Sequence, residues 1–225
     1  MSLIGDRIFQ LKNALPNGVT LIAVSKYHPN EDILSAYQAG QRIFGENIVQ
    51  ELCQKALALP QDIEWHFIGH LQKNKVKYIA PFISMIHSVD SFDLLKEINK
   101  YAQKNQRTIS CLLQIHIAQE EAKFGFLPQK CIEMLQSDNW RELSNVSICG
   151  IMGIATNTEN KLQIQNEFKA LSDLFCKIKS KHFNNSEDFN CCSWGMSNDY
   201  QIAIKEGSNM VRIGTLIFGE RIYNK

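Results

Sequence analysis

The sequence has 225 residues, of which 44% are hydrophobic and 21% charged, and this is enough to bury one sizeable core in a single domain over residues 1–225. The formal net charge of +1, from 24 basic and 23 acidic residues, argues against nucleic acid and anionic membranes as partners. The chain does not start with a basic segment and an apolar run, and no stretch approaches the roughly 18 apolar residues of a membrane span. We therefore expect a cytoplasmic protein.

Neither the cysteines nor the histidines are spaced like the ligands of a metal site. The seven cysteines form no Cys-x-x-Cys pair and are expected to be reduced, with the neighbours Cys191 and Cys192 on opposite faces of a strand. His66 and His70 are four residues apart, but Gly69 and the extended run around His66 argue against a helix there. No bound metal is expected.

Short apolar runs alternate with amphipathic segments along the whole chain. Helical spacing of apolar residues predicts a first helix over residues 4–15, which Pro16 and Gly18 end. Strands are predicted over residues 20–24, 42–47, 64–69, 85–88, 110–116, 146–151, 190–193 and 210–214. Helices are predicted between them, over residues 31–37, a segment ending at 59, and residues 74–80, 91–103, 128–136, 157–181 and 199–206.

Eight strands that alternate with helices indicate an α/β protein with a single (β/α)8 TIM-type barrel. The first strand is not followed by Gly-x-Gly-x-x-Gly, which argues against a dinucleotide-binding fold. In such a barrel the chemistry is found at the carboxyl ends of the strands, on the loops that lead into the helices. Candidate functional residues are therefore sought there.

Lys26 stands at the end of the first predicted strand, where the apolar residues 21–24 take its ammonium partly out of water. Desolvation disfavours the charged form, so we expect a lowered pKa for Lys26 and a neutral amine that can form a Schiff base with an aldehyde. A solvated lysine that merely ends a strand is the alternative interpretation of this segment alone.

The loops after the last two strands contain glycine, as phosphate sites in barrels do. Ser197 follows Gly195, and its hydroxyl can donate to phosphate oxygens or, alternatively, only cap the next helix. Gly214 and Thr215 offer the same chemistry in the last loop. Arg212 lies inside an apolar run and is expected to meet a ligand or a carboxylate, because an unpaired buried arginine is costly.

Short blocks of sequence occur in a characteristic order, at residues 23–26, 44–47, 49–51, 65–69, 71–72, 74–75, 87–91, 150–154, 195–199, 211–215 and 217–219. These blocks resemble the family of pyridoxal phosphate homeostasis proteins, of the YggS or PROSC type, which share the barrel of the alanine racemase amino-terminal domain. The resemblance covers residues 21–223. Two positions depart from the family pattern. Trp194 is a larger residue that is expected to change the pocket wall, and His70 stands where proline is common.

The resemblance implies pyridoxal 5'-phosphate (PLP) as the cofactor and Lys26 as the residue that carries it as an internal aldimine. It also implies that Ser197, Gly214 and Thr215 hold the phosphate, that Arg212 lies by the pyridine nitrogen, and that the ring is lined by Asn47 and Met152.

Three functions remain open for such a protein. The main prediction is a protein that binds PLP, takes part in vitamin B6 and amino-acid homeostasis, and does not turn over a substrate strongly. The resemblance suggests apo-PLP enzymes as recipients of the cofactor, and we expect the protein to be a monomer. A PLP-dependent racemase or lyase of low activity is the alternative. Racemases of the related fold use a second base from an added domain, which is not expected before the chain ends at Lys225. A Schiff-base aldolase on the same barrel is a third hypothesis.

Overall fold

The computed structural model describes residues 2–120 and 124–220. Its parallel strands form a closed barrel in chain order, from β1 to β8, and the last strand pairs with the first. The strands are β1 (Thr20–Val24), β2 (Ile43–Glu46), β3 (Glu64–Phe67), β4 (Met85–Val89), β5 (Ile109–Ile115), β6 (Val146–Gly153), β7 (Cys191–Met196) and β8 (Met210–Ile213). The predicted (β/α)8 barrel is confirmed.

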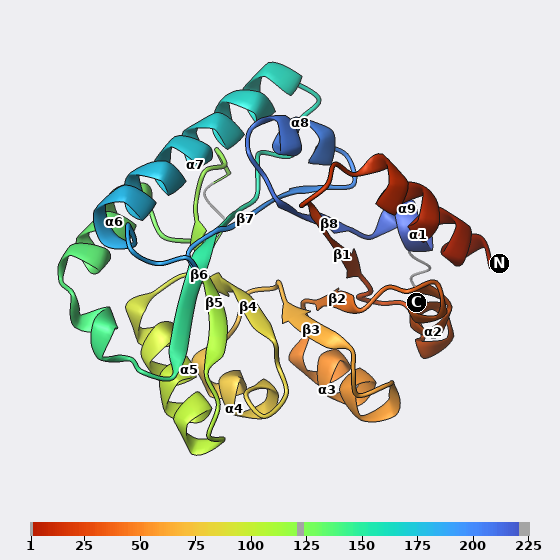
Figure 1. The fold of residues 1–225 in the computed structure, drawn as a ribbon, viewed down its shortest axis with the longest axis horizontal. Helices are drawn as coiled ribbons and strands as arrows, with labels where there is room; N and C mark the ends of the chain where they lie inside the picture. The colour runs from red at the N-terminus through yellow and green to blue at the C-terminus, as the bar shows by residue number, and fades with distance from the viewer. Residues whose placement is uncertain (1, 121–123, 221–225) are drawn as a thin grey trace.

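Helices surround the barrel, as Figure 1 shows, and each of the eight strands leads into one of them. The α-helices are α1 (Leu3–Ala14), α2 (Asn30–Gln38), α3 (Val49–Ala58), α4 (Val76–Ile79), α5 (Phe92–Lys104), α6 (Pro128–Gln136), α7 (Lys161–His182), α8 (Tyr200–Lys205) and α9 (Thr215–Phe218). The described residues also form the 3-10 helices η1 (Lys73–Lys75) and η2 (Asn139–Glu142). In the described part of the chain, no helix is both long and apolar enough to cross a membrane.

Local sequence signals account for the starts of three helices. Ser91 caps α5 as predicted, and its Oγ accepts a hydrogen bond from the amide of Leu94. Pro128 opens α6 at its first turn. The long helix α7 begins a few residues later than predicted, because Asn160 is its N-cap and accepts from the amide of Gln163.

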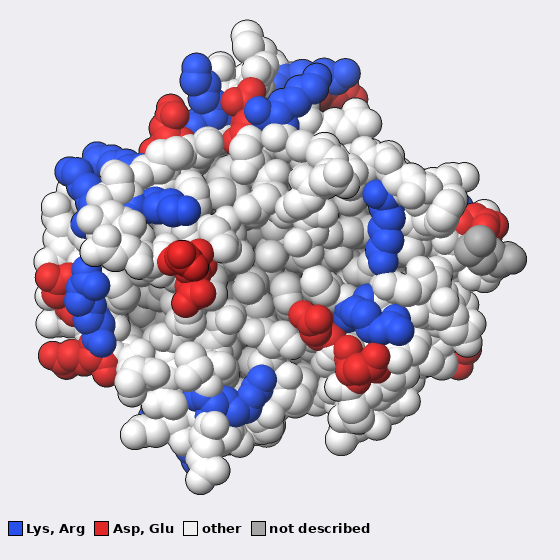
Figure 2. Space-filling model, viewed as in Figure 1, with Lys and Arg blue, Asp and Glu red and all other residues white. Residues whose placement is uncertain are grey.

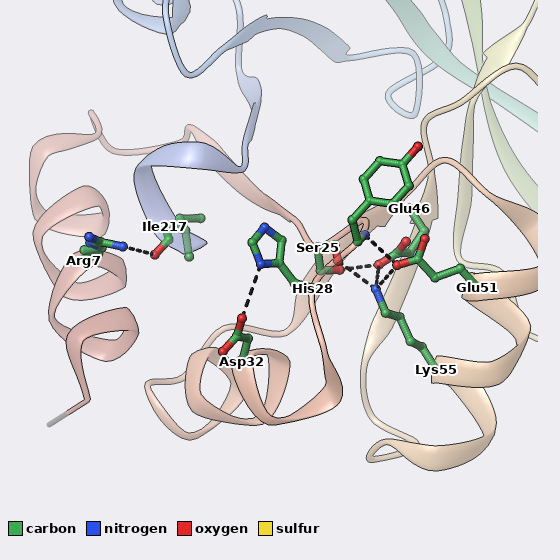
Figure 3. Close-up of polar contacts among 9 residues, drawn as sticks. Arg7, Ser25, His28, Asp32, Glu46, Glu51, Lys55 and Ile217 are labelled. Carbon is green, nitrogen blue, oxygen red and sulfur yellow. Dashed lines mark hydrogen bonds and ion pairs between the residues drawn. The ribbon is translucent and has the colours of Figure 1, made fainter. Parts of the chain in front are cut away.

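The last loop differs from the prediction. Thr215, which was predicted to lie in the loop after the eighth strand, is the first residue of the short helix α9. This helix packs beside α1, and Arg7 Nη1 donates a hydrogen bond of 3.2 Å to the carbonyl of Ile217 (Figure 3). A single turn of helix is too short to show a hydrophobic period, so the sequence did not reveal it.

The buried residues form two clusters, one on each side of the sheet. The larger cluster lies between the barrel and the helices and includes Phe44, Trp65, Phe168 and Trp194. The smaller one fills the barrel interior and includes Ile22, Leu112, Met152 and Met210. Because both faces of each strand are buried, the strands are apolar runs rather than alternating patterns. Cys192 belongs to the outer cluster and Cys191 contacts the inner one, so their predicted opposite orientation is confirmed.

Basic and acidic side chains are interspersed on the face shown in Figure 2, whose centre is recessed. Neither sign of charge dominates this face. This distribution agrees with the near-zero net charge of the sequence.

Candidate functional site

Lys26 lies just past the carboxyl end of β1, two residues after Val24, and is half-buried. The backbone turns sharply there, because the amide of His28 donates to the carbonyl of Ser25 at 3.1 Å. Tyr27 adopts the left-handed conformation with a φ of 65°, which is rare for a residue with a side chain. The sequence therefore placed Lys26 at the mouth of the barrel, whereas the lowered pKa expected for its amine stays a prediction.

The loops after β7 and β8 meet each other at the same end of the barrel. The amide of Gly214 donates to Ser197 Oγ at 3.3 Å. A Cβ on Gly214 would lie 3.1 Å from the carbonyl oxygen of Val24, so this backbone also passes close to the strand that carries Lys26. Thr215 is exposed and is the first residue of α9. Ser197, Gly214 and Thr215 are thus neighbours, and their hydroxyl and amide groups suit an anion.

Gly195 allows the loop after β7 to fold tightly against α8. Its φ is 94°, and a Cβ there would lie 2.6 Å from Ala203 Cβ and 3.0 Å from Tyr200 Cα. A residue with a side chain would be both strained and in collision. The position of Ser197, two residues later, depends on this close approach.

Arg212 points into the barrel interior and is 4% exposed. Its Nη1 donates to the carbonyl and to the hydroxyl of Ser193, both at 2.7 Å, and its Nη2 donates to the carbonyl of Gly153 at 3.0 Å. Within the described residues these bonds use three of the five donors of the guanidinium, which leaves two for a further acceptor. The carboxylate of Asp199 acts on the guanidinium electrostatically.

Arg212 keeps its charge at neutral pH. Burial lowers the pKa of its guanidinium to about 10, and the carboxylate of Asp199 opposes this shift. A fixed cation with free donors therefore faces the inside of the barrel.

Two buried histidines continue the hydrogen-bonded chain from Arg212 across the barrel. Ser193 Oγ lies 3.0 Å from His87 Nδ1, and His87 Nε2 lies 3.0 Å from His66 Nδ1. We name the chain Arg212–Ser193–His87–His66 the polar belt. His66 is thus engaged inside the barrel with His87, whereas His70 lies outside and pairs with Asp90 at 3.1 Å.

Both rings of the polar belt are neutral at pH 7. Burial lowers the pKa of His66 to about 4. Burial also lowers the pKa of His87 well below its ordinary value, and the nearby His66 and Arg212 add to the shift. A proton on either ring would place a second positive charge near the buried guanidinium.

Asn47 and Met152 complete the predicted set. Asn47 follows β2, and its Oδ1 is buried without a hydrogen-bond partner among the residues that the structure describes. A buried acceptor in this state is costly, and a ligand donor would satisfy it. Met152 is fully buried on β6, in the cluster inside the barrel. The orphaned amide oxygen, the fixed cation and the anion-suited loops together fit a polar ring that bears an anionic group.

Two features lie apart from this group. Trp194 is fully buried in the outer core cluster, whereas its neighbour Ser193 points inward, so the expectation that Trp194 changes the pocket wall is wrong. A separate cavity of about 560 Å³ lies beside the start of α7 and is lined by His116, Pro128 and Asn160, among others, but by none of the predicted site residues.

Comparisons with known proteins identify relatives over almost the whole chain. The alanine racemase N-terminal domain family matches residues 3–222. The chain is 39% identical to the pyridoxal phosphate homeostasis protein of Aquifex aeolicus, over 92% of this chain and 89% of that one. It is 38% identical to the protein of the same name from Haemophilus influenzae, over 95% and 90%. The solved structure of PipY from Synechococcus elongatus with PLP bound matches with a TM-score of 0.85 and 34% identity, covering 96% of this chain and all of that one.

Proposed function

The chain belongs to the alanine racemase N-terminal domain family and, within it, to the pyridoxal phosphate homeostasis proteins, and from this membership we propose that it binds PLP at the carboxyl end of its barrel. The similar protein PipY has been solved with PLP bound. The observation that supports the proposal best is the convergence of Lys26, the Ser197–Gly214 loops and Arg212 on one barrel mouth.

Lys26 is the proposed attachment point of the cofactor. Its neutral amine attacks the aldehyde carbon, a C=N bond forms, and the aldehyde oxygen leaves as water with the two protons of the amine. The half-buried position of Lys26 after a buried strand favours the neutral amine. When bound, PLP supplies an electron sink for chemistry at amino acids.

The phosphate and the ring are assigned to the remaining site residues. Ser197, Gly214 and Thr215 supply hydroxyl and amide donors to the phosphate, and Gly214 can approach closely because it has no side chain. Asn47 offers its unpartnered Oδ1 to a donor of the ligand, and Met152 lines the ring. These roles rest on the family pattern and on the shared location of the residues.

The proposed role is to hold the cofactor rather than to turn over substrate strongly. A guanidinium beside the pyridine nitrogen keeps that nitrogen unprotonated, which weakens the ring as an electron sink. Arg212 has two donors left for this contact and stays charged at neutral pH. The protein would then act in vitamin B6 and amino-acid homeostasis, as a monomeric single domain in the cytoplasm, with apo-PLP enzymes as recipients.

A PLP-dependent racemase or lyase of low activity is the alternative, and the match to the alanine racemase domain favours it. Deuterium exchange at the α-carbon of a panel of amino acids separates the two functions. Exchange no faster than that produced by the same concentration of free PLP supports the carrier. Faster exchange supports the racemase or lyase, and exchange at ordinary enzyme turnover, about 1–1,000 per second, refutes the carrier.

Reductive trapping tests the attachment of the cofactor. The purified protein with PLP is expected to show a yellow absorbance band that borohydride removes, and peptide mass spectrometry is expected to find the pyridoxyl group on Lys26. Lys26→Ala should lack the band, while the exposed Lys100→Ala should retain it. A pyridoxyl group on another residue, or on none, refutes the proposal.

Transfer to recipients is measured separately. The loaded protein is mixed with an apo-PLP enzyme, and the activity that the enzyme regains is compared with that produced by the same concentration of free PLP. Faster activation by the loaded protein supports delivery, whereas activation no faster than PLP release into solution contradicts it.

A further inference from the structure

Beside Ser25, the residue before Lys26, lies a cluster of charged side chains contributed by β2 and α3 (Figure 3). Lys55 Nζ lies 2.7 Å from each of three acceptors, which are the carbonyl oxygen of Ser25, Glu46 Oε1 and Glu51 Oε1. Its side chain is only 6% exposed. An ammonium has three N–H donors, so all of them are engaged in this cluster.

Glu51 extends the cluster to the other side of Lys26. Its Oε1 accepts a hydrogen bond of 2.6 Å from the amide of Tyr27, in addition to the bond from Lys55. The ring of contacts therefore runs from the carbonyl of Ser25 through Lys55 and Glu51 to the amide of Tyr27. We name Lys55 and Glu51 the clamp.

The clamp holds the two peptide groups that flank Lys26. The carbonyl of Ser25 belongs to the peptide before the Cα of Lys26, and the amide of Tyr27 belongs to the peptide after it. The orientations of these two planes define the φ and ψ of Lys26, because each peptide is planar. Fixing both planes fixes the direction in which the Lys26 side chain leaves the backbone.

The turn needs such support. Tyr27 has a φ of 65°, a conformation that its side chain disfavours. Hydrogen bonds to charged groups are stronger than neutral ones, and both peptide contacts of the clamp are of this kind. On the other side of the turn, His28 Nδ1 lies 3.3 Å from Asp32 Oδ2. The His28 ring stacks on the ring of Phe218, with the two ring centroids 4.8 Å apart.

We propose that Glu51 and Lys55 are positioning residues for Lys26, which hold its backbone so that its amine meets the cofactor aldehyde in one orientation. This inference rests on the proposed function of Lys26 as the attachment point. The clamp acts through the backbone, so its loss slows formation of the covalent bond and leaves the phosphate contacts intact. Misplacement of a reacting group by about 1 Å can cost about a hundredfold in rate.

Glu51→Ala is the sharpest variant, because it releases Tyr27 while the buried pair of Lys55 and Glu46 stays balanced in charge. Gln50→Ala, at an exposed position of the same helix, is the matched control. Bond formation is followed by stopped-flow absorbance with PLP. Noncovalent binding is measured by calorimetry with pyridoxine 5'-phosphate, which has the phosphate and ring but no aldehyde.

We expect Glu51→Ala to slow bond formation about ten- to a hundredfold while its Kd for pyridoxine 5'-phosphate stays within about twofold of the wild type. Gln50→Ala should change neither quantity, and Glu51→Gln, which keeps an oxygen acceptor, should recover most of the rate. If Glu51→Ala does not fold, Glu51→Met, which fills the same space but has no acceptor for the amide of Tyr27, serves in its place and is expected to slow the reaction in the same way.

Two results overturn the inference. One is bond formation at the wild-type rate in Glu51→Ala. The other is a loss of pyridoxine 5'-phosphate affinity as large as the loss of rate, which a general structural role would produce. Failure of the wild-type protein to trap PLP on Lys26 refutes the proposed function instead, so the two failures are distinguishable.

Discussion

Acid should destabilise this protein through the histidines of the polar belt before most carboxylates titrate. The pKa of His66 is about 4 in the folded chain, against 6.5 for an ordinary histidine. Below pH 6.5 the unfolded chain therefore binds a proton that the folded chain does not. His66 therefore leaves the free energy of unfolding unchanged above pH 6.5 and lowers it as the pH drops from 6.5 to about 4. Below about pH 4, the contribution of His66 stays constant.

The size of the effect follows from the same two pKa values. A difference of one pKa unit corresponds to about 1.4 kcal/mol, so the complete loss through His66 is about 3 kcal/mol, and the loss between pH 7 and pH 5 is about 2 kcal/mol. His87 acts in the same direction. Glu46 acts in the opposite direction, because burial raises the pKa of its carboxyl group, although Lys55 and the hydroxyl of Ser25 oppose this shift.

Urea denaturation at pH 7 and pH 5, on the wild type and on His66→Gln, isolates the contribution of His66. The glutamine keeps a donor and an acceptor but does not titrate. We expect the wild type to lose about 2 kcal/mol more than His66→Gln between the two pH values. Equal losses would refute the reasoning. So would an NMR titration of the His66 ring with a midpoint near 6.5, a measurement that does not depend on the variant.

Two further substitutions test the loop after β7. Ser197→Ala removes a hydroxyl from the proposed phosphate site, so PLP should be lost faster on dialysis while the covalent bond still forms. Unchanged retention of PLP would show that the Ser197 hydroxyl does not bind the phosphate and serves only to accept the hydrogen bond from Gly214. Gly195→Ala should lower the free energy of unfolding in urea by more than about 1 kcal/mol, since it combines a positive φ with a Cβ 2.6 Å from that of Ala203. Gly18→Ala is the control, because Gly18 has a similar φ of 86° but a Cβ there would meet no atom within 4 Å. If Gly18→Ala lowers the free energy of unfolding as much as Gly195→Ala does, the contact with Ala203 is not the cause of the loss.

The barrel was predictable because its strands are short apolar runs between strong breakers. Thr20–Val24 has the predicted bounds, since Gly18 precedes it and a polar turn follows it. Once the strands are parallel and the barrel closed, topology alone brings their carboxyl ends together. For this reason the sequence could place Lys26, Asn47 and Ser197 at one mouth without any knowledge of side-chain contacts.

The contacts that support these residues were not predictable in the same way. Lys55 has the helical spacing of an ordinary surface lysine, and its burial follows only from the position of Glu46 and of the Ser25 carbonyl, 30 residues away. His66 and His87 come from different strands, and no local pattern indicates that they bond. The buried arginine at position 212 was the one visible signal, but its partners Ser193 and Gly153 depend on the registers of β6, β7 and β8.

The energetics of the clamp indicate why buried charge is found at this position. A buried ion pair is weak evidence for stability, because removing two charges from water costs free energy that their attraction only partly offsets. Replacing the pair of Glu46 and Lys55 by apolar residues of similar size would therefore change stability little. An apolar pair, however, has no donor for the carbonyl of Ser25 and no partner for Glu51. What the charges supply, and apolar packing does not, is a fixed direction for the two peptide groups beside Lys26.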